Sequence, residues 1–401
     1  MLPYGEARKL ISELSLSRPP LSEETTPLSQ ALGRVCSTEL FGREPIPPFD
    51  NSSMDGYALA HARAFGASGA PTTLPVLGTI LAGDPPRCQA ESGVWKIMTG
   101  APIPAGCDCV VPVEQTRSLD DGRAVEISTI PHEGDFIRKA GHDFASGAQI
   151  CPAGTSLTPR HLMALAAAGL AQIPVRRKPR VALIATGREL SPAGEPLAPG
   201  KIRDASSSYL AAECERLGCH FDFHGVISDD ADAFAARLDA LLAMSYDVIL
   251  TTGAVSLGDK DFIPATLKSM GARTIFHKVA IKPGRPILFA EFPAGPFIFG
   301  LPGNPISSVV GMRFFVQPCL RDLLGQSEES PIRCRLKNRT DKPEGLRCFY
   351  KARRLELGQL EILPAQASFQ IHSLLAADSW AVLPEEGTYM TAGAEVDVYE
   401  A

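Results

Sequence analysis

Glycine-containing segments follow three of the apolar runs that predict buried strands. They are residues 186–189 (TGRE) after RVALIA, residues 251–261 (TTGAVSLGDKD) after YDVIL, and residues 300–305 (GLPGNP) after PFIF. In an open α/β sheet, ligands bind beyond the carboxyl ends of the strands. Glycine-rich turns that open helices offer free backbone N–H groups and a positive dipole end to an anion. The pattern predicts a site for phosphate or another oxyanion, although a single turn of this kind is also typical of an ordinary loop.

These turns match none of the common nucleotide-binding fingerprints. GxxxxGK[ST] and GxGxxG are both absent, so the sequence favours neither a P-loop nor a Rossmann dinucleotide site. No GxSxG elbow and no close histidine pair is present, so serine hydrolase and zinc chemistry are not indicated. The positions expected at the anion site are Gly187, Gly253, Ser256, Gly258, Pro302, Gly303 and Asn304.

Carboxylates follow the same strands. Glu189 comes after the first strand, Asp229 and Asp230 after the second, and Asp259 and Asp261 after the third. In proteins, Mg²⁺ is usually held by one or two carboxylates together with substrate phosphates. The sequence therefore supplies the donors for a magnesium ion beside an oxyanion. A second interpretation is that Asp230 or Asp232 caps the helix after the second strand, and that Asp261 likewise caps the helix after the third.

A cationic segment, KVAIKPGRP, adds Lys278, Lys282 and Arg285. The Pro-Gly turn within it can direct Lys282 and Arg285 to one place, and no acidic residue lies nearby in the sequence. Two cations close together suit a small dianion, because charge-assisted hydrogen bonds are the strong ones. The alternative is a solvated run of charge at the end of a strand.

The loops need a sheet to hold them, and residues 180–325 have the pattern of one. Apolar strands alternate with helical segments there, which is typical of a parallel sheet with helices on both faces. The last helix is expected to run through residues 304–325. Elsewhere the sequence predicts helices at residues 4–16 and 158–170, the latter capped by Thr158, and short strands at residues 46–140 and 331–401.

Composition excludes several classes of protein. The chain has 401 residues and a net charge of −6, so it is neither a general nucleic-acid binder nor a polybasic membrane binder. Gly and Pro number 35 and 34, which favours turns and β-rich modules over a helical bundle. No signal peptide or spanning helix is visible, and the ten cysteines include no CxxC. We therefore expect a soluble, cytoplasmic, multidomain protein with reduced thiols.

Six longer motifs together resemble one known family, the molybdopterin molybdenumtransferases, which include the MoeA proteins and the E domain of gephyrin. The motifs are PPFDNSSMDGYA (47–58), GHDFASGAQICPAGT (141–155), TGREL (186–190), TTGAVSLGDKDF (251–262), KVAIKPGRP (278–286) and GLPGNPISS (300–308). The resemblance covers essentially the whole chain. It implies molybdenum cofactor biosynthesis, in which molybdate is inserted into adenylylated molybdopterin with Mg²⁺-dependent release of AMP.

The resemblance also implies an elongated homodimer whose subunits have four domains. An αβα doubly wound domain that binds molybdopterin would comprise residues 1–20 and 176–326. A linking domain would comprise residues 21–45 and 141–175, a β-rich module would be inserted at residues 46–140, and a β-barrel-like domain would end the chain at residues 327–401. The implied partners are adenylylated molybdopterin, molybdate and a second copy of the chain, with transient contacts to molybdopterin adenylyltransferase and molybdoenzyme chaperones.

Site residues follow from the resemblance position by position. The family's functional acids are matched by Asp55, Asp143, Glu189, Asp229 and Asp261. Of these, Asp55 would reach across the dimer, whereas Glu189, Asp229 and Asp261 would hold Mg²⁺. The family's cations and hydroxyl, which suit a tetrahedral oxyanion, are matched by Lys278, Lys282, Arg285 and Ser307.

Four positions depart from the family pattern. Arg188, Ser206, Ala254 and Lys351 stand where the family usually has Asp, Asn, Gly and Arg. A Cβ at position 254 could press on a nucleotide, and lysine lacks the bidentate geometry of arginine. Two alternatives to the transferase remain open. One is a paralogue that binds molybdopterin or a partner as a scaffold without turnover. The other is a molybdopterin adenylyltransferase, which shares the αβα domain but needs only that domain.

Overall fold

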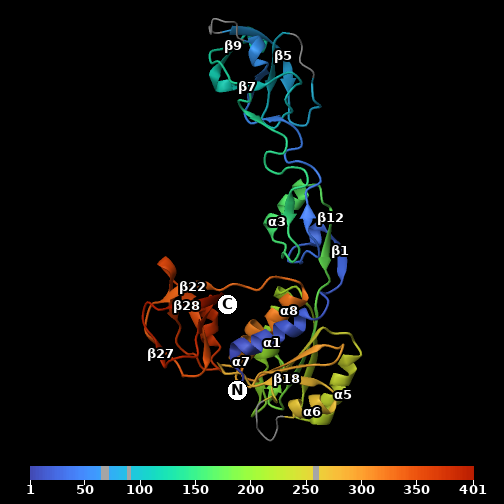
Figure 1. Cartoon of the computed structure of the whole chain (residues 1–401), viewed down its shortest axis with the longest axis vertical. Helices are drawn as coiled ribbons and strands as arrows, with labels where there is room; N and C mark the ends of the chain where they lie inside the picture. Colours follow the sequence, from blue (N-terminus) through green and yellow to red (C-terminus); the bar gives the residue numbers. More distant parts are fainter. Residues whose placement is uncertain (65–71, 88–91, 256–261) are drawn as a thin grey trace.

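A computed structural model describes residues 1–64, 72–87, 92–255 and 262–401, and it shows an elongated molecule (Figure 1). A β-rich module forms one end, and a narrow region that contains α3 (Pro159–Ala167) follows it. The opposite end holds an α/β domain beside a β-barrel, and both termini lie at that end. Among the described residues, no helix has the length and apolar character needed to cross a membrane.

The α/β domain is built on a six-stranded sheet in the order β16-β13-β17-β21-β20-β18. The strands are β13 (Arg180–Thr186), β16 (His220–Ile227), β17 (Val248–Thr252), β18 (Arg273–His277), β20 (Leu288–Glu291) and β21 (Phe297–Leu301). The first four in the order are parallel. The prediction of a parallel sheet is confirmed for these four and wrong at β20, which is antiparallel to both neighbours. Residues 292–296 between β20 and β21 are too few for the crossover of a dozen or more residues that a parallel pair needs.

Helices cover both faces of this sheet, which confirms the doubly wound αβα class. One face packs against α1 (Tyr4–Leu16), α4 (Ala205–Arg216), α7 (Pro305–Gly311) and α8 (Gln317–Leu323). The other packs against α5 (Ala231–Leu242) and α6 (Ile263–Ser269). Successive strand residues point to opposite faces, so Leu183 lies in the first core and Ile184 in the second.

The helix predicted for residues 304–325 is interrupted by a π-helical segment. It consists of α7 (Pro305–Gly311), the π-helical segment (Met312–Val316) and α8 (Gln317–Leu323). Pro318 lies in the first turn of α8. A proline inside a helix lacks an N–H and clashes with the carbonyl four residues earlier. The wider π turn relieves that clash, because this carbonyl belongs to residue 314 inside the π-helical segment.

Two smaller units extend from the α/β domain. In the first, β1 (Glu23–Pro27) pairs antiparallel with β12 (Gln172–Arg176) beside α3 (Pro159–Ala167). Thr158 caps α3 in a capping box with His161, as predicted. The second is the β-rich module, a six-stranded sheet in the order β7-β4-β6-β5-β9-β8. Its strands are β4 (Gly56–Leu59), β5 (Thr72–Ile80), β6 (Val94–Ile97), β7 (Cys109–Pro112), β8 (Thr116–Leu119) and β9 (Ala124–Ile127).

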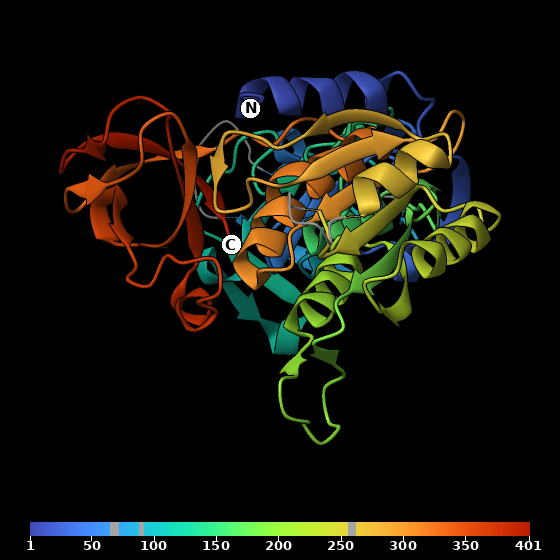
Figure 2. The same cartoon turned by 90° about the horizontal axis from the view of Figure 1, so that it is seen from below.

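The C-terminal strands form a closed barrel, which lies beside the α/β domain (Figure 2). They are β22 (Ile332–Leu336), β24 (Arg347–Arg354), β25 (Gln359–Ile362), β26 (Ser379–Leu383) and β28 (Glu395–Glu400), and pairing of β24 with β26 closes the ring. The short β19 (Ile281–Lys282) adds to β24. The segment that carries Lys282 therefore joins the barrel to the α/β domain.

Candidate functional site

β13 pairs with β16 on one side and with β17 on the other. The chain therefore continues from β13 in one direction to β16 and in the opposite direction to β17, so the strand order reverses between β13 and β17. Ligands of open α/β sheets bind at such a switch point. A Cβ added to Gly253, the residue after β17, would lie 2.5 Å from the carbonyl oxygen of Thr186 and 2.7 Å from its hydroxyl oxygen. Gly253 also has a φ of +84°. Only glycine fits this close approach of the two strand ends.

A cavity of about 580 Å³ opens at this switch point, and we call it the glycine-lined cavity. Gly303 faces Gly253 there, because a Cβ on Gly303 would stand 3.6 Å from the Cα of Gly253. Thr252 contributes a buried hydroxyl that has no hydrogen-bond partner among the described residues. The cavity thus combines close glycine backbone with an unpaired hydroxyl, which suits a polar ligand.

A second cavity, of about 640 Å³, shares Asn304 with the first, and we call it the cationic cavity. It contains Lys282, Arg285 and the buried Ser307. Neither cation has a carboxylate partner within the described part of the chain. Two unpaired cations and a hydroxyl can together bind a small dianion. Lys278 lines neither cavity.

The barrel domain supplies a wall to both cavities through residues 363–371. Residues 366–368 line the cationic cavity, and Phe369 and Ile371 line the glycine-lined cavity. A backbone amide of α7 donates a hydrogen bond to the carbonyl oxygen of Ser368 (2.9 Å). The wall is thus attached to the helix that follows the third glycine turn.

Lys351 holds this wall from inside the barrel. Its side chain is fully buried, and its Nζ donates hydrogen bonds to the carbonyl oxygens of Ala365 (2.7 Å) and Gln370 (2.9 Å). Burial lowers the pKa of this ammonium group. Lys351 lines neither cavity, so in this structure it supports the loop.

We expect Lys351→Met to lower the free energy of unfolding by about 1–3 kcal/mol, because two buried carbonyl groups lose their donor. The amides of residues 363–371 should then exchange faster in hydrogen-exchange mass spectrometry. Lys337→Met is the matched control, since its pair with Glu361 is partly exposed and such pairs contribute less than about 1 kcal/mol. Equal exchange of the loop in both variants would contradict this role for Lys351.

The acids predicted at the strand ends are only partly brought together. Glu189 lines the glycine-lined cavity, and its Oε1 would stand 2.8 Å from a Cβ added to Gly187. Asp229 is exposed after β16 and lines neither cavity. Asp230 is a helix cap, because its carboxylate accepts hydrogen bonds from two amides in the first turn of α5 (2.9 and 3.0 Å).

Three of the predicted positions, Ser256, Gly258 and Asp261, lie outside the described residues. In the part of the chain that the structure describes, no three His, Cys, Asp or Glu side chains form a group that could hold a metal ion. A magnesium site made by Glu189, Asp229 and Asp261 therefore stays a prediction.

The carbonyl oxygen of Pro302 accepts a hydrogen bond from the hydroxyl of Ser308 (2.5 Å), which fixes the turn before α7.

Asp55 and Asp143 are not brought to either cavity within one chain. Asp55 precedes β4, which pairs with β7 in the module at the far end of the molecule (Figure 1). The carboxylate of Asp55 accepts hydrogen bonds from the amide and hydroxyl of Thr99 (2.7 and 2.9 Å). These bonds hold the pKa of Asp55 below its usual value. Asp143 is exposed, and its amide donates to the carbonyl oxygen of Ile46 (2.9 Å).

Sequence reasoning missed several residues of the glycine-lined cavity. They come from the segment before α4 and from the barrel: Ile202, Arg203, Asp204, Phe369 and Ile371. The strand-end pattern gives no signal for them, because none follows a strand of the α/β sheet. Ser206, one of the departures from the family pattern, also lines this cavity.

Comparisons with known proteins cover the whole chain. Three family models match the chain. The MoeA N-terminal region (domain I and II) matches residues 2–169, the probable molybdopterin binding domain matches residues 182–322, and the MoeA C-terminal region (domain IV) matches residues 331–401. A molybdopterin molybdenumtransferase of Synechococcus elongatus is 38% identical over 99% of both chains. One of Haemophilus influenzae is 32% identical over 99% of this chain and 98% of its own. The solved molybdopterin biosynthesis moeA protein of Pyrococcus horikoshii OT3 has a TM-score of 0.84 and 27% identity, with full coverage of both chains.

Proposed function

Since the chain belongs to the molybdopterin molybdenumtransferase (MoeA) family, we propose that it inserts molybdate into adenylylated molybdopterin with Mg²⁺-dependent release of AMP. The chain is an enzyme of molybdenum cofactor biosynthesis. The observation that carries the detailed proposal is that the cationic and glycine-lined cavities meet at Asn304. This reaction needs an oxyanion site directly beside a nucleotide site.

Molybdate is assigned to the cationic cavity. Lys282 and Arg285 are free of carboxylate partners there, and Ser307 adds a hydroxyl from the neighbouring loop. Charge-assisted hydrogen bonds to a tetrahedral dianion favour this assignment. The Pro-Gly sequences at 283–284 and 302–303 restrict both loops, so that little conformational entropy is lost on binding.

The nucleotide part of the substrate is assigned to the glycine-lined cavity. Gly253 and Gly303 let a ligand approach the backbone closely, and the buried hydroxyl of Thr252 is available for a hydrogen bond. Phe369 is 68% exposed although it lines this cavity. An exposed phenyl ring at a cavity wall can stack on a planar ring of the substrate.

Mg²⁺ is assigned to Glu189, Asp229 and Asp261. The carboxylates of Glu189 and Asp229 have no hydrogen-bond partner among the described residues, and such oxygens are the ligands that Mg²⁺ takes in proteins. When bound, Mg²⁺ would neutralise charge on the phosphoryl group that leaves with AMP.

We expect the protein to be a homodimer, in which the module of one copy supplies Asp55 to the cavities of the other. The motive is the position of Asp55 at the far end of its own chain. Light scattering at micromolar concentration should give twice the 42.8 kDa mass of one chain. A mass of 42.8 kDa would contradict the dimer.

The test of the function is release of AMP from adenylylated molybdopterin by the purified full chain. AMP should appear only when both molybdate and Mg²⁺ are present, and tungstate in place of molybdate reports the preference for the metal oxyanion. The gene should also restore nitrate reductase activity in a strain that lacks its molybdenumtransferase. We place the reaction in the cytoplasm, which the absence of disulfides among the nine described cysteines supports.

The two alternatives give different outcomes in the same assays. A scaffold paralogue would bind adenylylated molybdopterin and fail to release AMP. An adenylyltransferase would instead consume ATP and molybdopterin and leave the adenylylated product. A pull-down from the native cell would then identify the proteins that supply the substrate and receive the cofactor. We expect molybdopterin adenylyltransferase and molybdoenzyme chaperones as transient partners.

A further inference from the structure

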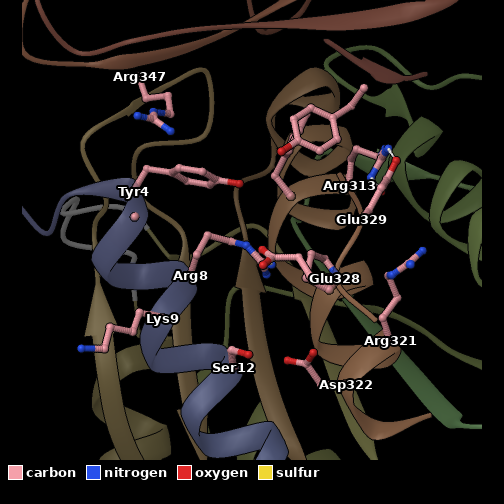
Figure 3. Close-up of a pocket in the computed structure, with 14 residues that line it drawn as sticks. Tyr4, Arg8, Lys9, Ser12, Arg313, Arg321, Asp322, Glu328, Glu329 and Arg347 are labelled. Atoms are coloured by element: carbon pink, nitrogen blue, oxygen red, sulfur yellow. Dashed lines mark hydrogen bonds and ion pairs between the residues drawn. The ribbon is translucent and has the colours of Figure 1, made fainter. Parts of the chain in front are cut away.

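A third cavity, of about 420 Å³, lies where α1 and α8 meet the barrel, and we call it the seam cavity (Figure 3). It shares no lining residue with the cationic or the glycine-lined cavity. Its walls come from α1, from the π-helical segment with α8, and from β24 and β28 of the barrel. π-Helical segments occur frequently at functional sites, and this one contributes Arg313 to the wall.

Positive charge exceeds negative charge in the seam cavity. Its lining contains Arg8, Lys9, Arg313, Arg321 and Arg347 against Asp322, Glu328 and Glu329.

Most of the carboxylates are already engaged. Glu329 forms a bidentate pair with Arg313 (2.7 and 2.9 Å), and Asp322 accepts a hydrogen bond from the hydroxyl of Ser15 (2.6 Å). Glu328 is 84% exposed, and its Oε1 lies 3.5 Å from Nη2 of Arg8, which is at the limit of a hydrogen bond. Outside the lining, Arg347 pairs with Glu385 (2.8 Å) and Lys9 with Glu13 (3.7 Å). Arg8 and Arg321 are therefore the lining cations without a close carboxylate partner among the described residues.

Three donors in the seam cavity have no acceptor. Nη1 of Arg8 and Nε of Arg347 are buried and unpaired, and the hydroxyl of Tyr4 has no partner within the described part of the chain. The ring of Tyr4 lies between the two arginines (Figure 3), and the guanidinium of Arg347 stands 5.2 Å from its centre. Burial raises the pKa of Tyr4 to about 12, so this hydroxyl keeps its proton and remains a donor.

A buried N–H donor without an acceptor is costly, and it favours binding of an anionic acceptor. We propose that the seam cavity binds a small molecule through a phosphate or carboxylate group, which accepts hydrogen bonds from Arg8, Arg347 and Tyr4. Such an anion would connect α1 of the α/β domain to β24 of the barrel. Because the barrel carries residues 363–371, the site is placed to tighten the wall of both substrate cavities. The proposal does not depend on the reaction assigned above.

The experiment is calorimetric titration of the full chain with inorganic phosphate and, separately, with succinate. It is done in an Arg285→Ala background, which weakens anion binding in the cationic cavity. In this background we expect one anion site per chain that depends on Arg8, and Arg8→Gln should weaken binding at that site at least tenfold. Lys9→Gln is the control on the same helix, since its side chain is 73% exposed at the rim, and it should change affinity less than threefold. Binding of phosphate alone indicates a phosphate ester as ligand, and binding of succinate alone indicates a carboxylate.

A second measurement separates binding from a structural role. In anion-free buffer, Arg8→Gln should unfold at no lower temperature than the parent, because its ion pair with the 84% exposed Glu328 at 3.5 Å contributes little to stability. The parent should gain thermal stability when the anion is added, and Arg8→Gln should lose that gain. The proposal is overturned if neither probe binds at millimolar concentration, if Arg8→Gln binds as tightly as the parent, or if Arg8→Gln alone lowers the unfolding temperature.

Discussion

Arg285→Ala is expected to raise the molybdate concentration needed for cofactor synthesis about 10- to 100-fold. A hydrogen bond to a charged group contributes about 1.5–3 kcal/mol, and about 1.4 kcal/mol is a factor of ten in affinity. Arg285 lines the cationic cavity without a carboxylate partner among the described residues, so its removal takes away attraction for the anion and leaves no acid unpaired. Affinity for the adenylylated substrate should stay close to that of the parent.

The assay is AMP release as a function of molybdate, together with direct binding of the nucleotide substrate. Arg333→Ala is the matched control, because Arg333 lies on the barrel, pairs with Asp397 and is 66% exposed. This control should leave both constants unchanged. If Arg285→Ala lost nucleotide binding and kept its molybdate dependence, the cationic cavity would be the phosphate site and the placement of molybdate would be wrong.

Local sequence patterns were sufficient to predict the α/β sheet and the loops at its carboxyl edge. RVALIAT and YDVILTT are apolar on both faces, as buried parallel strands must be, and each is followed by a glycine that the structure places at the switch point. The same patterns could not decide the role of Asp230, because a carboxylate after a strand fits both a metal ligand and a helix cap. Only the two amide contacts of its side chain identify it as a cap.

What the sequence could not predict depends on contacts between distant segments. In the sequence Lys351 is only a departure from the arginine usual in the family, whereas closure of the barrel buries it against two loop carbonyls. Phe369 lines a cavity of the other domain because residues 363–371 cross from the barrel to α7. The seam cavity likewise joins Tyr4 and Arg347, from opposite ends of the chain. No periodicity or short motif encodes such long-range pairs.

Gly253→Ala is expected to weaken nucleotide binding strongly while the domain stays folded. The added Cβ would meet the carbonyl and hydroxyl oxygens of Thr186 at 2.5 and 2.7 Å, so the ends of β13 and β17 must separate. Overpacking of this kind costs about 1–3 kcal/mol, and the φ of +84° costs alanine about 1–2 kcal/mol more.

The expected consequence for activity is larger than the loss of stability. Gly303 faces Gly253 across the glycine-lined cavity, so a shift of one loop changes the gap in which the nucleotide would lie. A misplacement of about 1 Å in a reacting site can reduce the rate about 100-fold. AMP release should therefore fall about 100-fold or more even under conditions in which circular dichroism shows a folded protein.

Ala254→Gly is the control that separates crowding from backbone flexibility. Ala254 is the next residue and has a φ of +49°, so its glycine variant relieves strain of about 1–2 kcal/mol and loses about 0.5–1 kcal/mol to backbone entropy. Stability should then rise by no more than about 1.5 kcal/mol, and AMP release should be retained or increased, because glycine is also the residue usual in the family. If Gly253→Ala and Ala254→Gly lost activity equally, a change in the mobility of this turn would be the cause, and not crowding by the added Cβ. If Gly253→Ala kept full activity, the nucleotide would have to bind away from the switch point of the sheet.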